Sequence, residues 1–352
     1  MSNVEQLPVQ PRREGKSVTL IGTDLPQPYL DEAEPSPLMH TASLWWRRAV
    51  KTLQVLAVIG LVGLYPALIV SSHEINDTPV ILSADSPWAS PETGVIVTLI
   101  GRELEGPGWA HDRPGWHPQA RLTGLPAWQD SVATSLSQFS RLMATKSATP
   151  DSNPDPDLSA AARLLMPELG LDQTARLNAA AEALARYEGR LERNLASRPA
   201  GLSDIIDELA LFAGWAEASH ERLSSRIGTR EGWPASREDI EAFFEARARA
   251  HVASQLLTAS LVSEPDVAVR ESVQSRLDQI EAHWRRAAEL DPVFVSNQSG
   301  GARLMADHLA MMAYYLGEAG EATRELGAAL VAESLAANAM EEAAAEDGGE
   351  DS

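Results

Sequence analysis

The stretch LSDIIDELALFAGWAEASHERLSSRI, residues 202–227, carries the pattern that decides the fold. Its apolar side chains recur at steps of three, four or seven residues, at Leu202, Ile205, Leu209, Phe212, Ala216 and Leu223. These spacings fall on one face of an α-helix, so the stretch predicts one long helix with a single buried stripe. Aromatic residues make up only 5% of the chain, which also favours helices over sheets.

The same periodicity occurs on both sides of this stretch, and prolines fall between the periodic runs. Further helices are predicted over residues 127–146, 177–195, 237–262, 265–284 and 304–330. We therefore expect a mainly α fold, in which residues 127–338 form an elongated antiparallel helical bundle. At most one or two short strands are expected near residues 94–101, where GVIVTLIG is apolar and β-branched between two glycines.

Residues 53–70, LQVLAVIGLVGLYPALIV, contain Gln54 as their only strongly polar side chain. Extended to residues 49–71, the run is long enough to span a membrane, because a helix needs about 20 residues to cross about 30 Å of hydrocarbon. Tryptophans and basic residues precede it, at Trp45, Trp46, Arg47, Arg48 and Lys51, and no basic residue follows it directly. Because positive residues stay inside, the pattern predicts a single-pass transmembrane helix in a bacterial inner membrane, with a cytoplasmic N-terminus and a periplasmic C-terminal domain. A buried core helix would not need this one-sided collar of basic residues and tryptophans, and a cleaved signal peptide rarely begins after about 45 polar residues.

Three segments lack helical periodicity. Residues 1–44 are rich in proline and charge and are expected to be a disordered cytoplasmic tail. Residues 72–126 are expected to be an extended lead-in followed by a loop of glycine, proline and tryptophan. Residues 339–352 are expected to be an acidic disordered tail.

The residues beyond the predicted membrane segment carry the whole net charge of −21, because they include 23 basic and 44 acidic side chains. Such a field repels nucleic acid, so no nucleic-acid partner is expected. The chain has no cysteine, which excludes disulfides, thiolate catalysis and cysteine-ligated metals. Phosphate-binding loops, dinucleotide fingerprints, paired-histidine zinc motifs and serine elbows do not occur in the sequence either. We therefore predict no catalytic residue, metal or cofactor.

The segment WAHDRPGWHP, residues 109–118, is the richest in chemistry. Its candidate binding residues are Trp109, His111, Asp112, Arg113, Trp116 and His117. Two histidines, an aspartate and an arginine between tryptophans have the composition of a ligand-binding or acid–base patch. The alternative is a structural role, in which the tryptophans and prolines pack the loop against the helices.

Two further groups of residues have a structural and a functional interpretation. The aspartates at 151, 155 and 157 suit either a helix-capping turn or a hard cation such as calcium, and the capping turn is favoured because the ligand pattern of a calcium loop is missing. His308 lies on the apolar stripe of the last helix. It is interpreted as a hydrogen-bonded core histidine in preference to a metal ligand or proton sensor.

Short motifs in a fixed order resemble a bacterial inner-membrane family, the domain-of-unknown-function 2333 family. They are DPDL at residues 155–158, the stretch 187–194, AELDP at 288–292, DHLA at 307–310 and YYL at 314–316. The last helix departs from that family's pattern at residues 317–321, which read GEAGE. The resemblance implies the topology of an anchored domain, and it implies no catalytic residues.

The sequence favours a non-enzymatic protein that contacts the lipid bilayer through residues 49–71 and binds or scaffolds another envelope protein. A homo-oligomer fits the small-residue spacing of Gly63 and Ala67 in the membrane segment. An envelope ligand-binding sensor or hydrolase that uses the loop from Trp109 to Trp128 is the alternative. A third hypothesis has the cytoplasmic tail signalling while the acidic domain senses cations.

Overall fold

The computed structural model describes residues 37–64, 68, 73, 75–81, 87–105, 108–147, 153–229, 235–268, 270–298 and 306–347. By its internal contacts the chain divides into two units, residues 1–60 and residues 61–352. The described part of the first unit is α1 (Pro37–Ile59), so the segment expected to be a disordered tail is helical from Pro37 to its end at residue 44. Residues 1–36 of that tail lie outside the described residues.

The five-residue π-helix η1 (Gly60–Leu64) directly follows α1. Within the part of the chain that the structure describes, no helix is both long and apolar enough to span a membrane. Of the predicted span 49–71, residues 65–67 and 69–71 lie outside the described residues.

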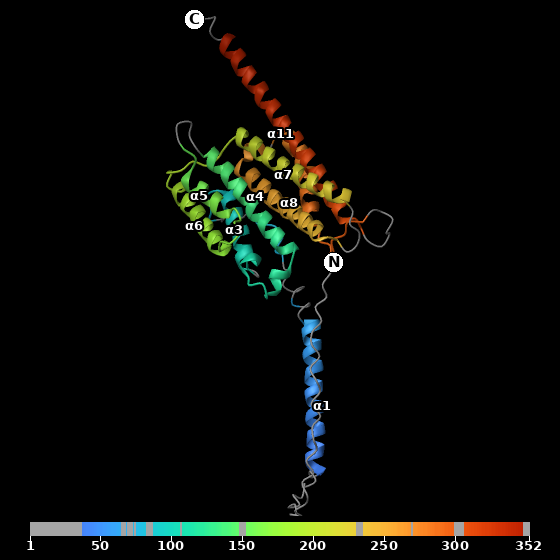
Figure 1. The fold of residues 1–352 in the computed structure, drawn as a ribbon. Helices are drawn as coiled ribbons and strands as arrows, with labels where there is room; N and C mark the ends of the chain where they lie inside the picture. The colour runs from blue at the N-terminus through green and yellow to red at the C-terminus, as the bar shows by residue number, and fades with distance from the viewer. Residues whose placement is uncertain are drawn as a thin grey trace, which may run out of the picture. The chain divides into compact units, whose positions relative to one another are not determined.

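The second unit is mainly helical, as predicted (Figure 1). Its α-helices are α3 (Pro91–Glu105), α4 (Gly124–Lys146), α5 (Pro156–Leu165), α6 (Gln173–Leu191), α7 (Leu202–Thr229), α8 (Arg237–Ser263), α9 (Pro265–Ala268), α10 (Glu271–Ala288) and α11 (His308–Asp347). Two short 3₁₀ helices, η2 (Ala110–Asp112) and η3 (Pro118–Arg121), precede α4.

Several helices begin at side chains that cap the helix N-terminus, and such residues can be recognised in the sequence. Ser236 accepts from the backbone N–H of Asp239, while the Asp239 carboxylate accepts from the backbone N–H of Ser236, which completes a capping box for α8. Asp155 caps α5 with Pro156 as its first residue, and Asp172 caps α6. Because these groups satisfy otherwise unpaired N–H groups, the starts of these helices are fixed.

The strand predicted near residues 94–101 is wrong, because these residues belong to α3. Val95, Ile96, Leu99 and Ile100 are at most 3% exposed and lie on one helical face, which packs against α6 and α8. Burial of that face outweighs the weak β preference of valine and isoleucine. Residues 72–126, expected to be lead-in and loop, therefore contain α3, η2 and η3, and no strand occurs among the described residues.

The helices of the second unit pack around one core (Figure 1). The pairs α4–α8, α4–α5, α5–α6, α7–α8 and α7–α11 are in contact, and α10 packs on α8 and α11. The largest fully buried aromatic side chains in this core, each less than 2% exposed, are Trp128, Trp284, Tyr187, Phe139, Phe212 and Phe243.

The C-terminal helix α11 continues to Asp347, past residue 338 where the bundle was expected to end. It extends beyond the neighbouring ends of α7 and α8 (Figure 1). The acidic segment from residue 339, expected to be disordered, is thus helical as far as Asp347. Alanine is the strongest helix former, and the alanine-rich sequence of residues 331–345 accounts for this continuation.

Candidate functional site

The loop that carries the candidate residues is fixed to the start of α4 by Gln129. This buried amide accepts from the backbone N–H of Ala110 at 2.9 Å and donates to the carbonyl of Gly108 at 3.1 Å. Trp109, between them, is only 2% exposed. The loop is thus held to α4 through its backbone, and Trp109 belongs to the buried core.

Asp112 joins this loop to the first turn of α6. Its carboxylate accepts from the backbone N–H groups of Gln173 and Thr174, at 3.1 and 2.7 Å, and from the Thr174 hydroxyl at 2.6 Å. A carboxylate at a helix N-terminus satisfies free N–H groups and complements the helix dipole. The role of Asp112 in this structure is therefore to position the loop.

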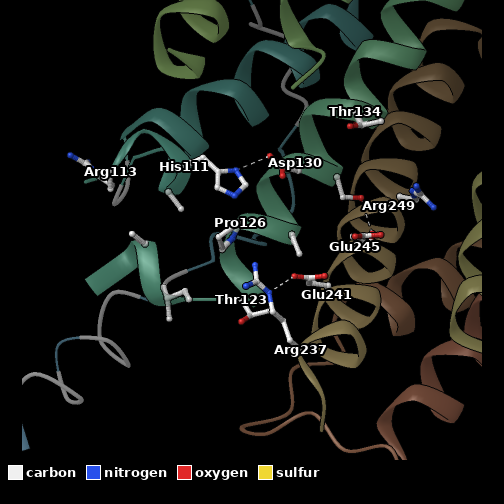
Figure 2. Close-up of a pocket in the computed structure, with 15 residues that line it drawn as sticks. His111, Arg113, Thr123, Pro126, Asp130, Thr134, Arg237, Glu241, Glu245 and Arg249 are labelled. Atoms are coloured by element: carbon white, nitrogen blue, oxygen red, sulfur yellow. Dashed lines mark hydrogen bonds and ion pairs between the residues drawn. The ribbon is translucent and has the colours of Figure 1, made fainter. Parts of the chain in front are cut away.

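His111 lies beside Asp130 of α4, with its Nδ1 3.5 Å from the carboxylate Oδ1 (Figure 2). The side chains are 49% and 38% exposed, so both are open to solvent. The hydrogen bond to Asp130 raises the pKa of His111 above its ordinary value, against the opposing effect of partial burial. This His–Asp pair can accept or donate a proton near neutral pH.

A first cleft, of about 550 Å³, opens next to this pair. Its walls come from the loop, from α4 and from α8 (Figure 2). Its charged or titratable lining residues are His111, Arg113, Asp130, Arg237, Glu241, Glu245 and Arg249. The last four recur every fourth residue along α8, which places them in one row on that helix.

The charges in this row are partly paired. Arg237 Nε lies 2.8 Å from Glu241 Oε1, and Arg222 Nη1 lies 2.9 Å from Glu245 Oε2. Arg249 donates to the Ser219 hydroxyl at 3.0 Å. Burial raises the pKa of Glu245 and lowers that of Arg249, although both groups have charged neighbours. The cleft therefore offers positively charged hydrogen-bond donors and negatively charged acceptors. Some of these groups are partly removed from water.

A second cleft, of about 780 Å³, shares His111 and Asp130 with the first. Its other walls are Trp109, Asp112 and residues 167–174, which connect α5 to α6. Because the His111–Asp130 pair lines both, we call the two together the His111 clefts.

The structure brings four of the six predicted residues to these clefts: Trp109, His111, Asp112 and Arg113. Trp116 is 73% exposed and lies outside both linings. His117 also lies outside them, and its Nδ1 accepts from the N–H of Gln119 at the start of η3. Asp130 and the α8 row were not predicted from the sequence. A charged residue at every fourth position from 237 to 249 was the signal that marked the row.

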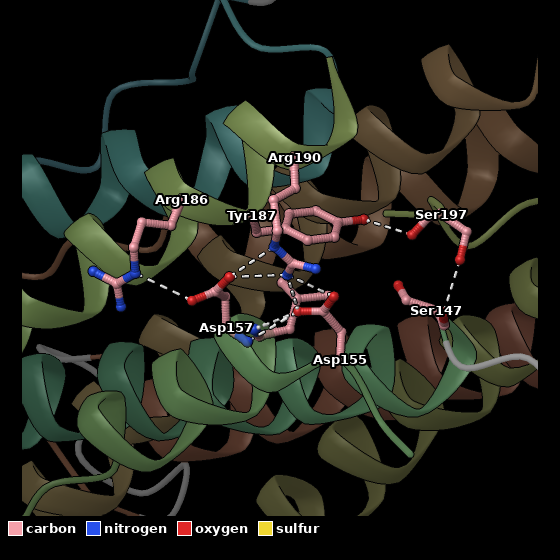
Figure 3. A network of polar contacts seen from close by, with 8 residues as sticks. Ser147, Asp155, Asp157, Arg186, Tyr187, Arg190 and Ser197 are labelled. Carbon is pink, nitrogen blue, oxygen red and sulfur yellow. Dashed lines mark hydrogen bonds and ion pairs between the residues drawn. The ribbon is translucent and has the colours of Figure 1, made fainter. Parts of the chain in front are cut away.

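The acidic loop before α5 is a structural joint. Arg190 of α6 donates to both carboxylate oxygens of Asp155 and to Asp157, and Arg186 donates to Asp157 at 3.1 Å (Figure 3). The Tyr187 hydroxyl donates to the Ser197 carbonyl beside this network (Figure 3). Because arginines occupy both carboxylates, the capping turn fits these residues better than a calcium site. Asp151 lies outside the described residues.

The histidines of the bundle have separate surroundings. His308 Nδ1 is 3.0 Å from the Ser296 hydroxyl, and His220 Nδ1 is 2.8 Å from the Ala313 carbonyl. His251 is 2% exposed beside Trp128, and burial lowers its pKa to about 3. Within the described ranges, no three His, Asp or Glu side chains are grouped so that they would hold a metal ion.

Comparison of the chain with models of known families, with curated proteins and with solved structures finds no match. The resemblance to the domain-of-unknown-function 2333 family therefore stays a prediction.

Proposed function

We propose that this chain is an envelope protein, anchored in the inner membrane by residues 49–71, whose periplasmic helical domain binds a polar partner in the His111 clefts. Its function is an interaction, and the bound segment belongs to another envelope component. The observation that carries the binding site is the His111–Asp130 pair, which lines both clefts.

The proposed anchor rests on the sequence. From Leu53 to Val70 the chain is apolar except for Gln54, and Arg47, Arg48 and Lys51 precede it. The apolar run has the length of the hydrocarbon layer, and the basic residues set its orientation.

The proposed ligand is polar because charged side chains dominate the first cleft. Arg113 and Arg237 are donors, whereas Asp130 and Glu241 are acceptors. A partner that carries both carboxylate and amine or hydroxyl groups, such as a peptide segment, matches these donors and acceptors. Partial burial of Glu245 and Arg249 strengthens any charge-assisted bond formed there.

Hydrolysis is the second candidate, because a histidine oriented by a carboxylate is the usual general base. The buried hydroxyl that lines the first cleft, on Ser131, donates to the Glu245 carbonyl at 2.9 Å. Among the described contacts, no hydroxyl is hydrogen-bonded to His111 to complete a nucleophile–base pair. Binding therefore fits the geometry better than catalysis.

Site-specific photo-crosslinking tests the binding proposal. A photoreactive residue at Thr134 or Arg237, which line the first cleft, is expected to form adducts in native membranes. The same residue at Glu321, exposed on α11, is the control. His111→Ala and Asp130→Asn should weaken the adducts at both cleft positions. Equal labelling at Glu321, or adducts that neither substitution changes, would contradict a binding role for the clefts.

A further inference from the structure

A third cleft, of about 520 Å³ and mainly apolar, lies where the domain begins. His73, Leu122, Ile240 and Phe244 form part of its lining, together with the turn at residues 291–295. It shares Leu122 and Thr123 with the first cleft, so the two are neighbours.

Two large apolar side chains stand out from the turn of this cleft. Val293 is 89% exposed and Phe294 is 69% exposed, directly after Pro292. The turn is held at its base, because Arg247 donates to Asp291 at 2.6 Å and the neighbouring Val295 is buried. Adjacent exposed apolar residues on a fixed turn are typical of a surface that meets a partner or a membrane.

His73 fixes the position of this cleft along the chain. Its ring packs edge-on against Phe244, with the ring centroids 5.2 Å apart. The proposed anchor ends at residue 71, and two residues of extended chain span at most about 7 Å. If residues 49–71 form the proposed anchor, His73 follows so closely in the chain that it lies within about one lipid headgroup layer of the point where the chain leaves the bilayer.

We propose that Val293 and Phe294 insert into the interfacial layer of the same bilayer that holds the anchor. This inference rests on the proposed anchor and goes beyond it, because it assigns a membrane-facing surface to the helical domain. In the interfacial layer, apolar side chains move from water to the boundary between headgroups and acyl chains. Arg121 in the same cleft supplies a cation for a lipid phosphate. The His111 clefts would then open beside the lipid surface.

The test measures the depth of single spin labels in the full chain, reconstituted in nanodiscs of phosphatidylethanolamine with a minority of phosphatidylglycerol. The chain has no cysteine, so Val293→Cys carries one unique label at an exposed position. Leu169→Cys, 94% exposed, is the matched aqueous control, and Leu56→Cys reports insertion of the anchor. At Val293 the ratio of oxygen to nickel-chelate accessibility should exceed that at Leu169 severalfold, because oxygen concentrates in the acyl region and the chelate stays in water.

The outcomes separate the two proposals. A lipid-exposed Leu56 with an aqueous Val293, equal to Leu169, overturns the membrane-facing surface and leaves the anchor in place. A Val293 shielded from both oxygen and nickel also overturns it, because another protein then covers the turn. An aqueous Leu56 overturns both proposals. Lipid exposure at Leu56 and Val293, but not at Leu169, supports both.

Discussion

Arg247 Nη2 on α8 lies 2.5 Å from Asp77 Oδ2, 170 residues earlier in the chain. The Arg247 side chain is 2% exposed, and its guanidinium also donates to Asp291 Oδ1 at 2.6 Å and to the Ala288 carbonyl at 2.9 Å. One buried charge therefore joins three segments, which are the chain around Asp77, helix α8 and the end of α10. The Arg247 Cζ atom lies 5.7 Å from the centroid of the Trp128 ring.

Removing both carboxylates should destabilise the domain far more than removing either one. Asp77→Asn and Asp291→Asn each leave one partner for Arg247, and we expect each to cost about 1 kcal/mol. The double variant leaves a buried charge without a counter-ion and should cost about 3–5 kcal/mol. Denaturant unfolding of the full chain in detergent measures the three differences. Strictly additive effects would show that Arg247 is not the common partner.

Glu208 predicts a pH-dependent stability. Its carboxyl lies among Ile205, Phe212 and Leu257, and desolvation raises its pKa to about 8. The folded state therefore holds a proton that the unfolded state releases near pH 4.5. The contribution of this group is full below that pH and is lost as the pH rises through about 8.

Glu208→Gln should remove this dependence. Relative to the native chain, the variant should gain about 2–4 kcal/mol of unfolding free energy at pH 8 and little at pH 4. Asp207→Asn, one residue earlier and about half-exposed, controls for the loss of a negative charge. Unfolding curves across this pH range give the comparison. A difference that is the same at both ends would contradict the buried, protonated state of Glu208.

The pairing of His111 with Asp130 predicts a shifted titration. NMR of the histidine ring should give His111 a pKa above 6.5, because the hydrogen bond to Asp130 stabilises the protonated ring. Asp130→Asn should lower it toward that value. His251 should stay neutral between about pH 5 and 8 in both forms, which makes it the internal control. An unchanged His111 titration in the variant would show that the pair does not form.

Two glycines of α11 test its packing on α7. A Cβ at Gly320 would lie 2.7 Å from the Ala216 Cβ, whereas one at Gly327 meets its nearest neighbour, the Leu209 Cβ, at 3.9 Å. Gly320→Ala should therefore destabilise the fold by about 1–3 kcal/mol through overpacking. Gly327→Ala should be neutral or stabilising by up to about 1 kcal/mol, since alanine is the better helix former. Thermal unfolding of both variants decides, and a stabilising Gly320→Ala would contradict the close contact of these helices.

Much of the helical pattern was predictable from local rules. The apolar stripe from Leu202 to Ile227 corresponds to α7, and Asp155 caps α5 as expected. α3 was missed because its apolar, β-branched sequence looks like a strand, and only its burial against α6 and α8 makes it helical.

The candidate site was half predictable for a similar reason. The loop with His111 could be located by composition, whereas its partner Asp130 comes from α4 and meets it only in the folded chain. The row from Arg237 to Arg249 has a simple spacing, but spacing alone does not show which face of α8 borders the loop. Trp116 and His117 belong to the same loop, but they do not line the clefts, and composition alone could not separate them from His111.

The proposed anchor is tested most directly by the side of the membrane on which the domain lies. Alkaline phosphatase, which is active only outside the cytoplasm, is fused after Ile81, and a second fusion after residue 36 is the control. We expect high activity after Ile81 and none after residue 36. A silent fusion after Ile81, with normal expression, would contradict the anchored and outward-facing domain.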